Sequence, residues 1–163
     1  FIDYTKRYSN LGRFCPYSIR MRDIINPDLQ QILVEKASDV FRRVFSRGTY
    51  GVVEPPRFET AAEVRMMYDA HCDISGHTMM PEAALARAIG ASYAALYVIS
   101  NHAEGILPNW KQSIFDIYES CAPIVGGVML NAMAAIDPEK VHNNSEENII
   151  KMPEHVAKRI DAE

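Results

Sequence analysis

A long helical pattern follows Pro27. Apolar positions recur there at helical spacing with charged residues between them, at Leu29, Ile32, Leu33, Ala37, Val40, Phe41 and Val44. Such positions line one face of an α-helix, and proline suits the first helical turn. The pattern predicts a helix from Pro27 through Phe45 that ends near Gly48.

Two shorter helices are predicted from their start signals. Thr60 and Glu63 have the spacing of a capping box, in which each side chain bonds the other residue's backbone N–H. A helix should therefore occupy residues 61–70. Pro81 fits the first position of another helix, and Gly90 fits its end.

The C-terminal third is predicted to be mainly helical. Residues 111–135 form a helical pattern, in which Pro123 and the glycine pair at 126–127 predict a kink or break. Residues 137–148 are polar, and 153–160 are predicted as a short terminal helix.

Three segments are predicted strands, because β-branched, aromatic or other apolar residues fill them. They are residues 49–54, 72–75 and 91–100, and residues 1–27 are mostly loop and short strand. The segment 91–100 is apolar along almost its whole length, which is typical of a strand buried on both faces. Alternating strands and helices predict the α/β class.

Composition narrows the class of protein. The chain has 163 residues, 48% hydrophobic and 23% charged, which fits one globular domain over 1–163. The net charge is −4 and the basic residues are scattered, so we expect no nucleic-acid partner. No apolar run is as long as a membrane span, and the three cysteines lack metal-ligand spacing. We therefore expect a soluble, cytoplasmic protein without a membrane partner.

Polar side chains follow each of the three predicted strands. Phe58 and Glu59 come after the first, Thr78 after the second and Asn101 after the third. Ligands in open α/β sheets bind where strands lead into helices, so these residues are candidate binding groups.

Each candidate also has a structural interpretation. Thr78 precedes a predicted helix start, where its hydroxyl can bind an anion such as phosphate or bond the local backbone. Asn101 can hold a purine edge with its donor and acceptor, or serve a turn. Phe58 can stack on a base or pack in the core, and Glu59 can accept an N–H or remain solvated. These alternatives stay open on the residues alone.

We expect no metal site. His71, His77 and His102 match no common ligand spacing, and no cysteine lies at a useful offset. A phosphate-binding Walker loop and a dinucleotide-binding fingerprint are also absent from the sequence.

The segments around these candidates resemble the family of trimeric purine nucleoside phosphorylases and methylthioadenosine phosphorylases. The resemblance rests on "PPRFET" at 55–60, "GHTMMPE" at 76–82 and the run "ALARAIGASYAALYVISNHAEG" that ends in Asn101 and Ala103. "FIDYTKR" at the start is also similar to a family segment. The resemblance implies an α/β fold with a mixed central sheet flanked by helices.

The resemblance also implies residue roles in phosphorolysis, in which inorganic phosphate attacks the sugar and the purine leaves. Phe58, Glu59, Asn101 and Ala103 would contact the base, with Asn101 catalytic. His77 would contact the ribose, where the family has methionine, and Thr78 would bind phosphate. The resemblance implies no cofactor beyond phosphate as co-substrate.

Asn101 and Ala103 resemble the branch of the family that cleaves 6-oxopurine nucleosides. The adenine-specific branch has aspartate at both positions. We therefore expect inosine, guanosine or methylthioinosine as the substrate class.

The family's N-terminal phosphate-loop portion has no counterpart in this sequence, so the resemblance implies the C-terminal part of the fold. We expect a subunit of a split or processed phosphorylase, active with a companion chain as a trimer or hexamer of such pairs. Two alternatives stay open: a non-catalytic structural or regulatory subunit, and a nucleosidase that uses water.

Overall fold

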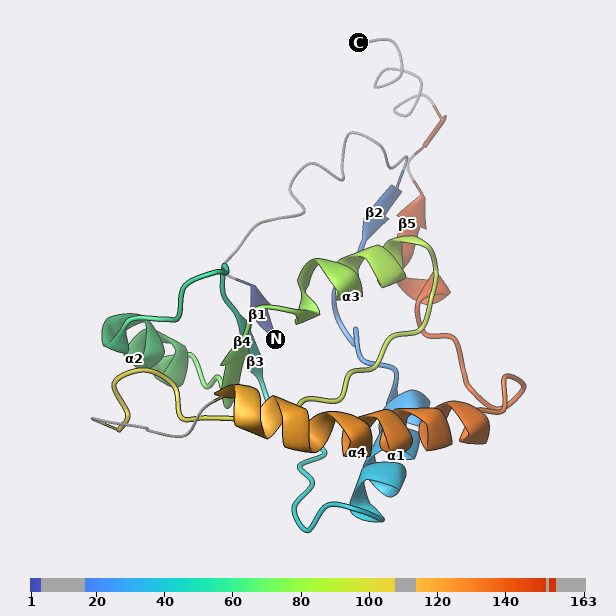
Figure 1. Cartoon of the computed structure of the whole chain (residues 1–163). Helices are drawn as coiled ribbons and strands as arrows, with labels where there is room; N and C mark the ends of the chain where they lie inside the picture. The colour runs from blue at the N-terminus through green and yellow to red at the C-terminus, as the bar shows by residue number, and fades with distance from the viewer. Residues whose placement is uncertain (4–16, 108–113, 152, 155–163) are drawn as a thin grey trace.

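The computed structural model describes residues 1–3, 17–107, 114–151 and 153–154. Its helices and strands alternate from α1 to α3, as the α/β class predicts (Figure 1). In chain order they are β1 (Ile2–Asp3), β2 (Tyr17–Ile19), α1 (Pro27–Ser38), β3 (Tyr50–Val52), α2 (Ala61–Asp69), β4 (Ile74–Gly76), α3 (Met79–Ala88), α4 (Ile114–Ala135), the 3₁₀-helix η2 (Glu146–Asn148) and β5 (Ile149–Lys151).

The described strands form two small sheets. Strands β1, β3 and β4 pair in parallel with β3 in the centre, so that Gly51 lies opposite Ser75. Strands β2 and β5 form a separate antiparallel pair. Parallel strands end at the same edge of a sheet, so the loops after β3 and β4 emerge side by side.

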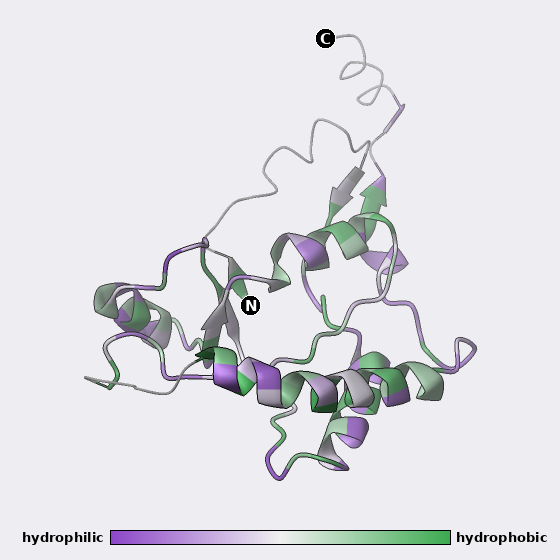
Figure 2. Cartoon of the chain, in the orientation of Figure 1, coloured by the Kyte–Doolittle hydropathy of each residue, from purple (hydrophilic) through white to green (hydrophobic). Residues whose placement is uncertain are grey.

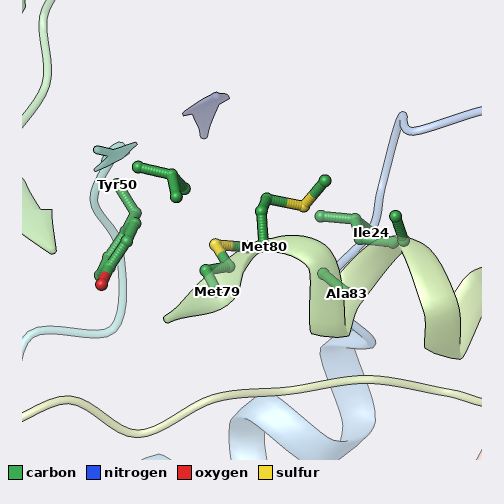
Figure 3. Packing of buried hydrophobic residues seen from close by; sticks show 7 residues of the cluster. Ile24, Tyr50, Met79, Met80 and Ala83 are labelled. Carbon is green, nitrogen blue, oxygen red and sulfur yellow. The ribbon is translucent and has the colours of Figure 1, made fainter. Parts of the chain in front are cut away.

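The core lies between the parallel sheet and α3. Figure 3 shows Met79 and Met80 between Tyr50 of β3 on one side and Ile24 on the other. Met80 and Val52 are fully buried, as are the small residues Ala83 and Ala84 of α3. The core therefore fixes the start of α3 against the end of β3.

Helix α1 begins as predicted but ends early. The Asn26 side chain accepts from the amides of Asp28 and Leu29 at the start of the helix, each at 3.0 Å. The predicted end near Gly48 is wrong, because the helix ends at Ser38. Helices gain most of their stability by burying a face, yet Val40 is 57% exposed and Phe45 78% exposed.

The predicted capping box of α2 is confirmed. Thr60 Oγ1 accepts from the Glu63 amide at 3.2 Å, and Glu63 Oε2 accepts from the Thr60 amide at 2.7 Å. Arg57 adds two hydrogen bonds to the same carboxylate, at 2.6 and 2.9 Å. The bond from Arg57 and those from Thr60 lower the pKa of Glu63 to about 2.

Replacing Glu63 with glutamine should reduce the acid sensitivity of folding. A carboxyl with a lowered folded-state pKa stabilises the fold above its unfolded pKa, and this stabilisation is lost as the pH falls through the folded value. The wild type should therefore lose stability between about pH 4.5 and pH 2, and the Glu63→Gln variant should lose less. Urea midpoints at pH 5 and pH 3 measure the difference. Glu119→Gln, at an exposed glutamate of α4, should keep the wild-type difference between the two pH values.

The predicted strand at 91–100 is wrong as a paired strand. Within the described residues it makes one isolated bridge, between Tyr93 and Ile25, and most of its side chains are half-buried. A strand needs a neighbour to satisfy its backbone groups, and no further described strand pairs with it. The apolar composition of residues 91–100 indicated that the segment is partly buried, but composition does not tell which strand, if any, the segment pairs with.

The C-terminal half differs from its prediction in two places. Helix α4 (Ile114–Ala135) continues through Pro123 as one element, so the chain does not break there, which leaves the kink as a prediction, and 111–113 lie outside the described residues. Strand β5 was not predicted, and the predicted terminal helix falls almost entirely outside the described residues. Figure 2 shows apolar colour over much of α4, which packs against α1.

A buried polar hub joins three distant segments. The fully buried Arg87 guanidinium donates to the carbonyl oxygens of Asn144, Arg22 and Asp23, at 2.8, 3.2 and 2.7 Å. The buried Asn26 amide donates to the carbonyl of His142 at 2.7 Å. Backbone groups that would otherwise be unsatisfied are thereby paired, and the chain around 22–28, 87 and 142–144 is held together.

Candidate functional site

One hollow of about 680 Å³ lies at the ends of β3 and β4. The segment 96–103 and part of α4 form its other walls. The hollow brings together all the residues predicted from the sequence as candidate binding groups: Phe58, Glu59, His77, Thr78, Asn101 and Ala103. Residues up to 45 positions apart are therefore able to touch a single ligand the size of a nucleoside.

An aromatic pair lies on one side of the hollow. The rings of Phe58 and His77 are 6.3 Å apart between centroids and inclined by 43°. Phe58 is 49% exposed, so it is not a core aromatic. An aromatic ring in such a position can stack on a planar ligand.

Glu59, next to this pair, is only 7% exposed. A solvated surface charge is therefore not its role. A buried carboxylate requires hydrogen-bond donors, and a ligand N–H is a suitable donor here.

The Asn101 side chain is held from two sides. Its Oδ1 accepts from the Ser100 hydroxyl at 2.7 Å, and its Nδ2 donates to the His102 carbonyl at 3.0 Å. These bonds fix the orientation of the amide. An amide oxygen has two lone pairs and an amide nitrogen has two hydrogens, so one acceptor and one donor remain for a ligand.

Thr78 lies directly before α3, yet its side chain makes no capping bond to the helix. Bonding of the local backbone is therefore not what occupies its hydroxyl. The Thr78 oxygen lies instead 3.4 Å from the Tyr50 hydroxyl.

Tyr50 and Tyr97 line the hollow beside Thr78 and were not identified as site residues from the sequence. Their rings stack with centroids 4.5 Å apart and planes inclined by 32°. Burial raises the pKa of the Tyr97 hydroxyl, so Tyr97 is a neutral phenol near neutral pH. Aromatic residues in apolar strands look like packing residues, which is why the sequence pattern gave no signal for them.

The position of Tyr50 depends on Gly76 in the neighbouring strand. A Cβ atom built at Gly76 would overlap the Tyr50 hydroxyl. The glycine is therefore required by the close approach of the phenol, at the point where β3 and β4 lie side by side.

Gly76→Ala should destabilise the chain by about 1–3 kcal/mol and displace Tyr50 from Thr78, because the added methyl overfills the space. Urea unfolding measures the first effect. Gly126→Ala is the matched control, since a Cβ there meets no atom within 4 Å and alanine suits a helix. A Gly76→Ala variant as stable as the Gly126→Ala control would contradict this account.

Helix α4 contributes a wall that the sequence did not predict. Tyr118, Cys121, Ala122 and Val125 line the hollow from successive turns.

Among the residues that the structure describes, no group of three histidine, cysteine or acidic side chains is arranged for a metal. Within the same ranges, no helix combines the length and hydropathy that a bilayer crossing requires.

Comparison with known proteins finds a matching protein family. The Phosphorylase superfamily profile matches residues 2–120. A probable 6-oxopurine nucleoside phosphorylase of Thermococcus kodakarensis is 37% identical over 111 residues, which are 68% of this chain and 41% of the relative. A probable S-methyl-5'-thioinosine phosphorylase of Xylella fastidiosa is 45% identical over 110 residues, 64% of this chain and 46% of the relative. The chain thus spans less than half the length of these relatives.

Solved structures share the fold. A methylthioadenosine phosphorylase from an antarctic soil metagenomic library superposes with a TM-score of 0.71 at 24% identity, over 90% of this chain and 56% of that one. The methylthioadenosine phosphorylase of Schistosoma mansoni in complex with adenine gives 0.69 at 21% identity, over 81% and 52%.

Proposed function

Because the chain belongs to the Phosphorylase superfamily, we propose that it supplies the base-binding part of a purine nucleoside phosphorylase that cleaves 6-oxopurine nucleosides with inorganic phosphate. The family resemblance predicted from the sequence is confirmed by this match and by the named relatives. The observation that carries the proposal is the single hollow shared by Phe58, Glu59, Thr78 and Asn101.

The proposed chemistry matches the residue types at the hollow. Cleavage of the glycosidic bond gives the sugar oxocarbenium character and leaves negative charge on the departing purine. The free N–H of Asn101 would donate to the base, and this bond strengthens as the charge on the base grows. Asn101 therefore stabilises the transition state more than the bound substrate.

The remaining groups would orient the substrate. Phe58 stacks on the base, and Glu59 accepts an N–H from it. Ala103 leaves space beside the base, and His77 lies against the ribose. Thr78 donates to a phosphate oxygen, and no cofactor takes part.

The 6-oxopurine preference follows from hydrogen-bond polarity. An oxo group requires a donor, which the asparagine amide can supply, whereas the aspartate of the adenine-specific branch can only accept, as the exocyclic amine of adenine requires. Relatives named for 6-oxopurine nucleosides and methylthioinosine agree with this preference.

We also propose that activity requires polypeptide that carries the remaining part of the family fold, in a trimer or hexamer of such pairs. The hydroxyl of Thr78 carries no charge with which to neutralise phosphate. The chain matches about two fifths of its relatives, and the half-buried segment 91–100 has backbone groups with which a further strand could pair. Exposed apolar residues of α4 provide surface for the same contact.

The test is reconstitution. The chain is produced with the part of the Thermococcus kodakarensis relative that it does not cover, and release of hypoxanthine from inosine is measured with and without phosphate. Phosphate-dependent release that requires both polypeptides supports the proposal. Release without phosphate would favour a nucleosidase, and no release would favour a non-catalytic subunit. Faster cleavage of adenosine than of inosine would contradict the base preference.

A further inference from the structure

A group of hydroxyls extends from Thr78 into the wall of the hollow. The Tyr50 hydroxyl lies 3.4 Å from Thr78 Oγ1, and the Tyr97 ring stacks on the Tyr50 ring with centroids 4.5 Å apart. Three elements contribute to this group: β3 through Tyr50, the start of α3 through Thr78, and the segment 91–100 through Tyr97.

The two tyrosines nearest Thr78 are fixed in place. Tyr50 is 7% exposed and belongs to the core cluster, and its hydroxyl fills the space that the missing side chain of Gly76 leaves. Tyr97 stacks on Tyr50 and is half-buried. Their hydroxyls therefore hold defined positions, whereas an isolated threonine hydroxyl rotates freely.

The direction of the hydrogen bonds decides what Thr78 can do. If a phenol O–H donates to Thr78 Oγ1, the threonine proton is left to point into the hollow toward an anion. A phenol O–H can donate in this way. Donors that are oriented before the ligand arrives bind more tightly than donors that must be ordered.

We propose that Tyr50 is a positioning residue that holds the Thr78 hydroxyl toward the phosphate, an inference that rests on the proposed function. Tyr50 acts through Thr78 and does not itself touch the reacting atoms, and the ring of Tyr97 supports it by stacking. The phosphate side of the hollow thus includes one residue beyond Thr78 whose hydroxyl matters.

The hydroxyl-deletion variant Tyr50→Phe tests the inference in the reconstituted enzyme. It keeps the ring, so it should raise the KM for phosphate about 5- to 10-fold, the effect of one neutral hydrogen bond, and leave the KM for inosine within about twofold. Thr78→Ser keeps the hydroxyl and should stay near wild type, whereas Thr78→Val should match or exceed the effect of Tyr50→Phe. Tyr68→Phe, at an exposed tyrosine of α2, is the matched control.

A Tyr50→Phe variant that leaves the KM for phosphate unchanged, or raises both KM values equally, overturns the role of Tyr50. A second measurement separates this result from failure of the proposed function. With 3-fluorotyrosine incorporated, the fluorine resonances of Tyr50 and Tyr97 are followed as sodium phosphate is added at constant ionic strength. If the wild type cleaves inosine with water alone, phosphorolysis fails, but phosphate-dependent shifts that Thr78→Val abolishes still support the inference. Absence of such shifts overturns it.

Discussion

Asn101→Ala is expected to lower the kcat/KM of the reconstituted enzyme for inosine by about 10²- to 10³-fold, the usual effect of removing one fixed donor to a developing negative charge. The amide is oriented by Ser100 and His102, so its remaining N–H is directed before the substrate binds. Most of the loss should be in kcat, because the bond strengthens in the transition state. Steady-state kinetics with varied inosine at saturating phosphate measure it.

The matched control is Asn131→Ala, an exposed asparagine of α4 that does not line the hollow. It should keep wild-type kinetics. Asn101→Asp should also lose activity on inosine, because a carboxylate cannot donate to an oxo group. An Asn101→Ala variant with less than about a threefold loss would remove Asn101 from the catalytic role.

Arg87→Met is expected to cost about 3 kcal/mol or more in the free energy of unfolding, since it leaves three carbonyl oxygens without their donor. Methionine fills a similar volume, so the loss reports mainly on hydrogen bonding. Urea unfolding followed by circular dichroism measures the change. The hub lies outside the hollow, so the first effect should be on stability and not on the KM values.

Arg65→Met, at an exposed arginine of α2, should stay within about 0.5 kcal/mol of wild type. Arg87→Lys should fall between the two, because one ammonium group cannot replace the planar fork of donors. Equal midpoints for Arg87→Met and Arg65→Met would show that the hub does not hold the three segments.

Short sequence motifs correctly predicted where two helices begin, because a helix start depends on residues that are close together in the chain. The capping box at Thr60 and the proline at the start of α1 were sufficient to place two helices. The end of α1 was predicted wrongly, because the apolar period continues through Val40 and Phe45 although no core covers them. Whether a face is covered depends on residues far away in the chain.

The same distinction applies to the site. Phe58, Thr78 and Asn101 were found because each follows a predicted strand, and ends of parallel strands converge. Tyr50 and Tyr97 were missed, since their hydroxyls face the hollow only in the packed structure. Arg87 was missed as well, because its carbonyl partners lie more than 50 residues away in sequence.

Gly76 gives the molecule an unusual kind of functional position. It offers no group for chemistry, and its contribution is empty volume that one phenol occupies. In a saturation-mutagenesis screen, Gly76 should tolerate as few replacements as the positions that contact the substrate. Mutational intolerance by itself would therefore not distinguish a residue that only leaves space from one that binds the substrate.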